Sequence, residues 1–363
     1  MTRIIITLAL LISNYLGFAQ VENKQNSDSK TLIYLDSLAK NHLSNKINCG
    51  LSIGFIKDNK MTFKYYGESK KGSKTVPNAT TLYEIGSITK TFTGILLANA
   101  LNANKLSLDD DIRKFLPKGY ENLEFEGKPI LIKHLSNQTS GLPRLPENLE
   151  NQVKFDDYNP YKNYTSKMMF DFLKQVKLTR IPGSVYEYSN YAVALLGQIL
   201  EIVTNKKLEV QLNEIITSKF NMPNTKFDLD ETEKSNEAFG YDATGNQTSF
   251  WDFDAIKSAG GLKSSLSDMM NYLQVNIQEN NPDVLLSHQQ TTTITSPNVA
   301  LNWHINKTKD NKTIIWHNGG TGGFTSICGF VKEQKIGVIV LNNSTTSVDN
   351  LAMQLLKFLR NNP

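Results

Sequence analysis

The stretch YEIGSITKTFTGILLANAL, residues 83–101, places a lysine one helical turn after a serine and then continues mainly in apolar residues. Residues three apart lie on one side of a helix, so Ser87 and Lys90 are expected to be neighbours. Burial by the apolar run would lower the pKa of Lys90. A serine beside such an amine is an activated nucleophile, and the helix start offers a free backbone amide to a developing oxyanion. A serine cap with a solvent-facing lysine is the alternative, because Ser-x-x-Lys alone is a weak signal.

A second polar pair precedes a long apolar helix. In PGSVYEYSNYAVALLGQIL, residues 182–200, Tyr188 and Asn190 follow a Pro-Gly turn. A loop held by such a helix can aim a phenol and an amide into a cleft. The alternative is a tyrosine whose hydroxyl reaches solvent and an asparagine that caps the helix.

A third candidate lies in WHNGGTGGF, residues 316–324, where His317 stands on a predicted strand that runs into Gly319 and Gly320. Glycines allow the backbone to approach a ligand closely, without side-chain obstruction. A glycine-rich hairpin connection is the alternative.

A fourth motif, GLSIG at residues 50–54, matches the Gly-x-Ser-x-Gly pattern of a nucleophile elbow. That elbow requires a strand, a sharp turn and a helix in succession. Here the match lies inside a predicted strand, and a charged turn and a second strand follow it. The sequence therefore does not favour a nucleophile at this position.

The two ends of the chain predict one sheet with helices on it. Two stretches, 32–43 and 348–359, have apolar residues at helical spacing and would cover a sheet face. Strand-like runs lie beside them, at residues 51–57, 60–69, 312–319, 323–334 and 335–343.

The intervening chain has a mostly helical pattern. A long helical insertion between strands of one sheet produces two lobes, and clefts between lobes are where ligands usually bind. We therefore predict an α/β fold with an active site between two domains. Residues 31–82 and 308–363 would form a discontinuous domain, an antiparallel sheet flanked by helices, and residues 83–307 would form a mostly helical inserted domain.

Composition places the chain among globular proteins. It has 363 residues, of which 39% are hydrophobic, and 39 Lys and Arg residues against 35 Asp and Glu residues give a formal charge of +4. The short basic loop at residues 68–74 is the one local cluster of positive charge. The sequence therefore predicts no nucleic-acid partner and no binding to an acidic lipid surface.

The N-terminal residues indicate export. Residues 1–19 combine an early arginine, a short apolar run and small residues at the expected cleavage point, as in a secretory signal peptide, and a polar tail follows at 20–30. A membrane anchor is the alternative, but the apolar run is shorter than the roughly 20 residues that a spanning helix requires. We expect a periplasmic or extracellular protein with no stable membrane span after signal cleavage.

The order and spacing of the three motifs are more specific than any one of them. Ser-x-x-Lys at 87, Tyr-x-Asn at 188 and His-x-Gly at 317 resemble the motifs of the penicillin-recognising serine hydrolases. The closest likeness is to the branch of class C β-lactamases, family VIII esterases, D-aminopeptidases and related penicillin-binding proteins. HLSNQTSGLP at 134–143 and SAGGLKSSLSDM at 258–269 also look like family segments, and the resemblance covers nearly everything after about residue 30. It implies a β-lactamase/transpeptidase-like fold.

The resemblance also implies a role for each catalytic residue. Ser87 would be the nucleophile that becomes acylated, and Lys90 would help to deprotonate it. Tyr188 would carry the proton as base and then as acid, which requires its pKa to fall from about 10 through nearby positive charge. No metal or organic cofactor is implied.

Other motif residues would bind the substrate. Asn190 would orient the substrate and Lys90, and Gln138 would line the pocket for a substrate amide. The backbone amides of Ser87 and Gly320 would form the oxyanion hole, which contributes about 3 kcal/mol per donor. In the sheet order of the family that the sequence resembles, another strand separates Cys49 from Cys328, so no disulfide between them is expected.

The sequence departs from the β-lactamase pattern at the third motif. His317-Asn318-Gly319 stands where class C enzymes usually have Lys-Thr-Gly, and a histidine with an ordinary pKa of about 6.5 offers little fixed charge at neutral pH. The segment after VIVLNN also lacks the arginine of many class C enzymes. Both changes weaken recognition of an anionic substrate.

Three functions remain open at this level. The favoured one is an acyl-enzyme-forming hydrolase that cleaves a carboxyl ester or a D-amino-acid peptide amide, with a small-molecule or peptide substrate such as a cell-wall fragment. A β-lactamase is the first alternative. The second is a cell-wall or penicillin-binding sensor that keeps the fold without turnover.

Overall fold

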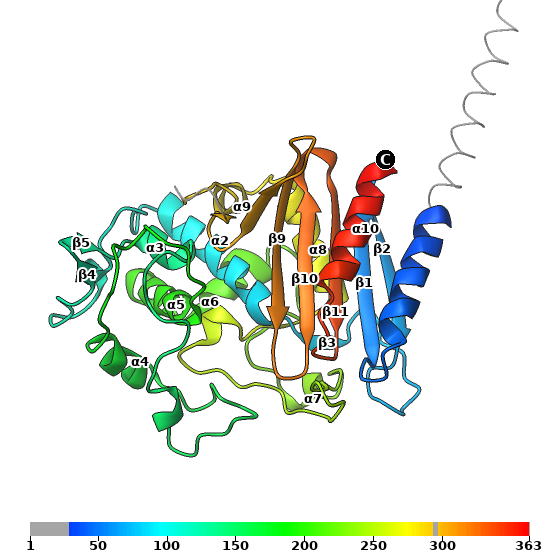
Figure 1. Ribbon diagram of the computed structural model, residues 1–363, viewed down its shortest axis with the longest axis horizontal. Coiled ribbons are helices and arrows are strands. Elements are labelled where there is room, and N and C mark those ends of the chain that lie inside the picture. The colour runs from blue at the N-terminus through cyan, green and yellow to red at the C-terminus, as the bar shows by residue number, and fades with distance from the viewer. Residues whose placement is uncertain (1–28, 293–296, 363) are drawn as a thin grey trace, which may run out of the picture.

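One seven-stranded sheet dominates one half of the molecule in this computed structural model, which describes residues 29–292 and 297–362 (Figure 1). Every neighbouring pair of strands is antiparallel. The strands are, in spatial order, β2 (Lys60–Gly67), β1 (Gly50–Lys57), β11 (Ile336–Asn342), β10 (Thr325–Val331), β9 (Thr313–Gly320), β8 (His304–Lys307) and β7 (Asn298–Val299).

The sheet joins the two ends of the chain, as predicted. N-terminal β1 pairs with C-terminal β11, and Ile53 lies opposite Val340. Side chains alternate between the two faces of β11, since successive residues of a strand point in opposite directions. Val338 and Val340 join one apolar cluster, whereas Ile339 and Leu341 join the other. The predicted α/β class and the antiparallel sheet are confirmed.

Helices cover both faces of the sheet (Figure 1). Helix 29–43 and α10 (Asp349–Asn361) pack on one face, where the rings of Tyr34 and Phe358 stack with centroids 4.3 Å apart. On the other face lies α8 (Leu266–Gln278), and the ring of Tyr272 stacks at 4.1 Å on Phe92 of α2 (Thr89–Asn102).

The rest of the chain between residues 83 and 307 is mostly helical and irregular. Its remaining helices are α3 (Ile132–Ser136), α4 (Ser166–Leu173), α5 (Asn190–Thr204), α6 (Leu208–Leu212), α7 (Glu231–Lys234) and α9 (Pro282–Ser287). Two short strand pairs accompany them, β3 (Leu82–Glu84) with β6 (Lys263–Ser265) and β4 (Glu124–Phe125) with β5 (Lys128–Pro129).

Two strands of the sheet lie inside the stretch that was expected to be helical. β7 and β8 precede residue 308, and they are two and four residues long. Runs this short carry too few residues to display an alternating pattern. The domain boundaries at 82 and 308 therefore remain a prediction, and part of the predicted helical stretch contributes to the sheet.

Helix α2 differs from an ordinary surface helix, because residues 89–98 are all buried. The apolar run after Ser87 was expected to bury one face, but α2 packs against α5 and α9, and also against α8 through the Phe92–Tyr272 stack. At Gly94 an added Cβ would lie 2.1 Å from the carbonyl oxygen of Leu301, so the backbone of the connection between β7 and β8 approaches α2 directly. α2 is the central helix of the molecule.

The other expectations concern the cysteines, the false motif and the N-terminus. Cys49 and Cys328 are both buried and free, and β11 lies between their strands, as predicted. GLSIG lies within β1, so the structure has no strand–turn–helix elbow at this motif.

The predicted signal peptide and most of the polar tail fall outside the described residues. None of the helices in the described part of the chain has the length and apolar character needed to cross a bilayer.

Candidate active site

Ser87 lies in a tight turn between β3 and α2. The turn is the 3₁₀-helix η1 (Gly86–Ile88), which runs directly into α2. Gly86 has a φ of +49°, and a Cβ there would lie 2.6 Å from the backbone nitrogen of Gly320. Both the backbone conformation and the approach of β9 therefore require glycine before the serine.

Lys90 lies one turn further along and is completely buried. Its Nζ is 3.0 Å from Ser87 Oγ, and it donates hydrogen bonds to Asn190 Oδ1 at 2.8 Å and to the carbonyl oxygen of Ala259 at 2.5 Å. These acceptors are neutral. Among residues 29–292 and 297–362, no carboxylate pairs with this amine.

This environment favours the neutral amine. Burial, and secondly the positive charge of Arg144, hold the pKa of Lys90 well below its ordinary value, as the sequence predicted. A neutral amine has two N–H donors and one lone pair. The two donors satisfy Asn190 and Ala259, so the lone pair can face the hydroxyl of Ser87. The geometry therefore suits proton abstraction from Ser87 by Lys90.

Tyr188 lies over the same amine. Lys90 Nζ is 4.9 Å from its ring centroid, and the guanidinium carbon of Arg144 is 5.1 Å from it. The expected fall in the pKa of Tyr188 is wrong. Burial raises that pKa above its ordinary value and outweighs the lowering by the hydrogen bond with Ser87 and by the charge of Arg144. At neutral pH the phenol therefore keeps its proton, which makes it a proton donor.

The loop before α5 positions Tyr188 and Asn190. Ser189 caps α5, because its Oγ accepts a hydrogen bond from Ala192 N at 2.9 Å. Ser189 N in turn donates to Gln138 Oε1 at 2.6 Å. Gln138 is only 2% exposed, so it braces this loop from inside and does not line the pocket. Its expected contact with a substrate amide is therefore not supported.

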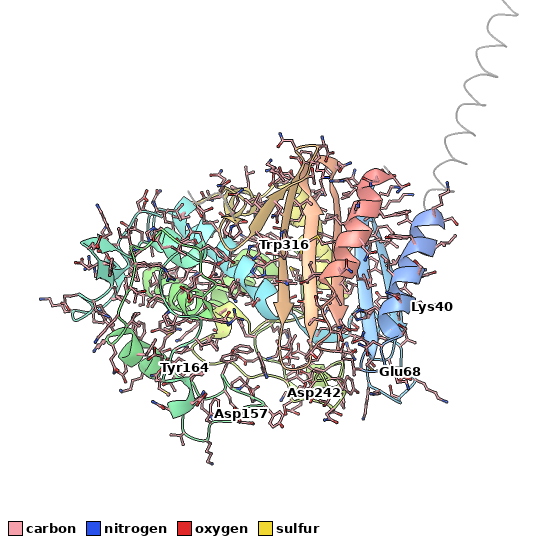
Figure 2. The ribbon with its side chains drawn as sticks, in the orientation of Figure 1. Lys40, Glu68, Asp157, Tyr164, Asp242 and Trp316 are labelled. Carbon is pink, nitrogen blue, oxygen red and sulfur yellow. The ribbon has the colours of Figure 1, made fainter. Side chains whose placement is uncertain are left out.

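The third motif lies on β9 and is partly buried. His317 is 2% exposed, and its ring centroid is 5.0 Å from that of His304. The ring of His304 also approaches that of Trp316, which Figure 2 labels on β9. Burial, followed by the nearby His304 and Lys90, holds the pKa of His317 well below its ordinary value. His317 is therefore neutral and supplies no fixed charge, as expected.

The two glycines of this motif have different roles. A Cβ on Gly319 would lie 2.0 Å from the carbonyl oxygen of Ile85, which also accepts a hydrogen bond from Ser326 Oγ at 2.8 Å. Gly319 therefore lets β9 approach the serine turn, whereas the sequence suggested that it lets backbone approach a ligand. Gly320 lies next to it and lines the pocket beside Ser87.

A pocket opens at Ser87, with an empty volume of about 470 Å³ that is partly open to solvent. Sequence reasoning placed Ser87, Asn190 and Gly320 here, but it missed most of the wall. The missed side chains include Arg144, Tyr161, Trp251, Phe253 and Thr321. Arg144 directly follows the segment HLSNQTSGLP at 134–143, and this position beside a family segment was the one sequence signal that could have pointed to it. The aromatic residues come from loops without a recognisable pattern.

A buried carboxyl supports this wall from behind. Glu84 is 2% exposed and accepts hydrogen bonds from Trp251 N and from Thr321 Oγ1, both at 2.6 Å. Burial raises the pKa of Glu84 to about 7, although both hydrogen bonds oppose the rise. Glu84 thus ties β3 to both sides of the pocket.

The comparisons with known proteins agree with this architecture. A family model described as Beta-lactamase matches residues 35–360, and the chain therefore belongs to this family. The sequence-based assignment to the penicillin-recognising serine hydrolases is confirmed, and the family supports a serine hydrolase.

Similar proteins of known sequence are identical to this chain at about a quarter of the aligned positions. Protein flp of Staphylococcus aureus strain MRSA252 is 27% identical over 363 residues, which cover 94% of this chain and 68% of that protein. A protein named Beta-lactamase from Pseudomonas fluorescens is 26% identical over 347 residues, which cover 85% of this chain and 92% of that protein.

Solved structures share the fold. The octameric penicillin-binding protein homologue from Pyrococcus abyssi has a TM-score of 0.79 and 26% identity, and the match covers 90% of this chain and 77% of that one. A β-lactamase/D-alanine carboxypeptidase from Pseudomonas syringae also has a TM-score of 0.79, at 20% identity, over 92% of this chain and 99% of that one. At that identity the second match shows the fold alone.

The raised pKa of Glu84 predicts a specific pH dependence of stability. A carboxyl with a folded-state pKa of about 7 and an unfolded-state value near 4.5 stabilises the fold below about pH 4.5, and this contribution is lost as the pH rises through 7. The free energy of unfolding of Glu84→Gln minus that of the wild type should therefore rise by on the order of 3 kcal/mol as the pH increases from 4.5 to 8. Urea unfolding across this range measures the difference, and Glu121→Gln controls for the loss of an exposed carboxyl. A difference that stays constant with pH would contradict the raised pKa.

Proposed function

We propose that this chain is a serine hydrolase that forms an acyl-enzyme through Ser87 and cleaves a carboxyl ester or a D-amino-acid peptide amide. The observation that carries the proposal is the buried amine of Lys90, 3.0 Å from Ser87 Oγ and without a carboxylate partner in the described part of the chain. A buried ammonium without a partner is costly, so this amine is held in its neutral form. Proton abstraction from the adjacent hydroxyl is such a use.

The first half of the reaction acylates the serine. Ser87 Oγ attacks the substrate carbonyl carbon while its proton passes to Lys90 Nζ. The backbone amides of Ser87 and Gly320 stabilise the oxyanion of the tetrahedral intermediate. The bond to the leaving alcohol or amine then breaks, and the leaving group takes a proton from Tyr188, which recovers one from Lys90. The acyl group remains on Ser87 Oγ.

The second half releases the acyl group. A water molecule attacks the acyl carbon and gives up a proton to the neutral Lys90–Tyr188 pair. The ester bond to Ser87 breaks, Ser87 regains its proton, and a carboxylic acid leaves. Asn190 holds Lys90 through Oδ1 in both halves, because its hydrogen bond fixes the direction of the amine.

The third motif bears on the substrate class. His317 is buried and neutral, so it cannot replace the ammonium of Lys-Thr-Gly at that position. This supports an ester or a D-peptide over a β-lactam. The 26% identity to a protein named Beta-lactamase keeps β-lactam hydrolysis as the second candidate.

Export of the mature protein is part of the proposal. Residues 1–19 have the composition of a signal peptide. When the full chain is expressed in a Gram-negative host, the mature protein should be recovered from the periplasm or the medium with an N-terminus near residue 20. Intact mass measurement checks this. An uncleaved protein in the cytoplasm would contradict export.

The nucleophile is tested by Ser87→Ala. Hydrolysis of p-nitrophenyl butyrate should fall to the background rate, because no other group takes over the attack, while the circular dichroism spectrum and thermal unfolding stay as in wild type. The panel should also include nitrocefin and D-Ala peptides, to separate the candidate substrates. A wild-type rate in Ser87→Ala would remove Ser87 from the mechanism. A label from a fluorescent penicillin or phosphonate that persists on wild type without turnover would favour a sensor.

The separate roles of Lys90 and Tyr188 make a second prediction. If Tyr188 protonates the leaving group, Tyr188→Phe should lower kcat/KM for an ethyl ester or an amide by about 10²- to 10³-fold. The loss should be smaller for p-nitrophenyl esters, because p-nitrophenolate leaves without a proton. Equal losses on both substrates would instead place Tyr188 in the attack step.

A further inference from the structure

Arg144 is a pocket residue that the catalytic scheme does not use. It lines the same pocket as Ser87 and Asn190, and its side chain is exposed. In the described part of the chain, no carboxylate forms an ion pair with it. Its charge acts on the lysine and the tyrosines of the site, since it lowers the pKa of Lys90 and opposes the rise in the pKa of Tyr188.

The backbone of Arg144 is fixed to the site. Its carbonyl oxygen accepts hydrogen bonds from Asn190 N at 3.0 Å and Tyr191 N at 3.3 Å, at the first turn of α5. The guanidinium carbon lies 5.1 Å from the ring centroid of Tyr188. The side chain is thus anchored at its base and packed over an aromatic ring, while its N–H groups remain available to a ligand.

Arg144 also defines the charge of the pocket. Of the described residues that line it, Arg144 alone carries a formal charge. His317, the counterpart of the family's lysine, is buried and neutral. Any fixed attraction for an anionic substrate within this pocket therefore comes from the α5 side, and the third motif provides none.

The position of the pocket indicates which part of a substrate it receives. Its lining includes Ser87 and Gly320, but it does not include Tyr188 or His317. In the proposed reaction the leaving group departs toward Tyr188, its proton donor. In the proposal below the pocket receives the acyl part, although Arg144 also lies 5.1 Å from the ring centroid of Tyr188, and the position of the carboxylate in the test esters checks this assignment.

Three aromatic side chains form part of the wall. The ring centroid of Tyr161 is 5.0 Å from that of Phe253 and 5.2 Å from that of Trp251. Such rings contact a short hydrocarbon chain well. The wall therefore places aromatic surface near one positive charge.

We propose that the pocket selects acyl groups that carry a carboxylate, which pairs with the guanidinium of Arg144 while the methylene groups contact Tyr161 and Trp251. The proposal rests on the proposed hydrolase function and specifies its substrate class as half-esters or half-amides of short dicarboxylic acids. Arg144 would be a specificity residue. A guanidinium can bind a carboxylate through two parallel hydrogen bonds.

The test compares three esters on four proteins. p-Nitrophenyl butyrate is neutral, mono-p-nitrophenyl glutarate carries the carboxylate on the acyl part, and 4-carboxyphenyl butyrate carries it on the leaving group. The proteins are wild type, Arg144→Gln, Arg144→Lys and Lys118→Gln, which removes an exposed positive charge from a residue outside the pocket lining. The readout is the ratio of kcat/KM for each anionic ester to kcat/KM for the neutral ester.

In Arg144→Gln the ratio for the glutarate ester should fall about tenfold, mainly through KM. Arg144→Lys should lower the glutarate ratio by a smaller factor than Arg144→Gln does, and Lys118→Gln should leave the ratio unchanged. The neutral ester serves as the internal reference, because loss of Arg144 also changes the environment of Lys90. An unchanged glutarate ratio would overturn the proposal, and so would a fall confined to 4-carboxyphenyl butyrate.

A binding experiment separates this proposal from the hydrolase function. Ser87→Ala is titrated calorimetrically with monomethyl glutarate and with neutral dimethyl glutarate, alone and combined with Arg144→Gln. The half-ester should bind about tenfold more tightly than the diester, and Arg144→Gln should remove this preference. Absence of the preference, or of binding, overturns the assignment of Arg144. Absence of ester hydrolysis in the wild type would overturn the hydrolase function, and the binding preference would still test Arg144.

Discussion

The burial of one amine constrains the whole site. Lys90 has no exposed surface, and its Nζ lies among the oxygens of Ser87, Asn190 and Ala259. A buried ammonium without a counter-ion is expensive, so the protein lowers its pKa and keeps it neutral. Three separate parts of the chain must therefore converge on this nitrogen: the start of α2, the first residue of α5 and the turn η5 (Lys257–Ala259). The position of α2 at the centre of the molecule follows from the same requirement.

The second constraint is the contact between the sheet and the serine turn. Gly86 and Gly319 have no side chains, so β9 and the turn approach at backbone distance. This contact brings the backbone nitrogen of Gly320 next to the turn that carries Ser87, although the two residues are far apart in sequence. Buried Glu84 stabilises this contact further, because its carboxylate accepts hydrogen bonds from Trp251 N and from Thr321 Oγ1. The proposed oxyanion hole lies at the junction between the sheet and the helical part.

The charges of the pocket lie in an unusual place. The third motif offers no fixed cation, because its His317 is buried and its pKa is lowered. A positive charge is present instead on Arg144, whose backbone also completes hydrogen bonds to the first turn of α5. The fixed charge of this pocket therefore lies beside the start of α5 and not on β9.

The sequence by itself determined the features that depend on residues near one another in the chain. The pairing of Ser87 with Lys90 follows from a three-residue spacing on a helix, and the strands at both chain ends follow from alternation in apolar residues. The rest depends on neighbours that are distant in sequence. The internal role of Gln138, the raised pKa of Tyr188 and the position of Arg144 were decided only by the tertiary structure, because burial and electrostatic surroundings are set by which distant segments pack around a side chain.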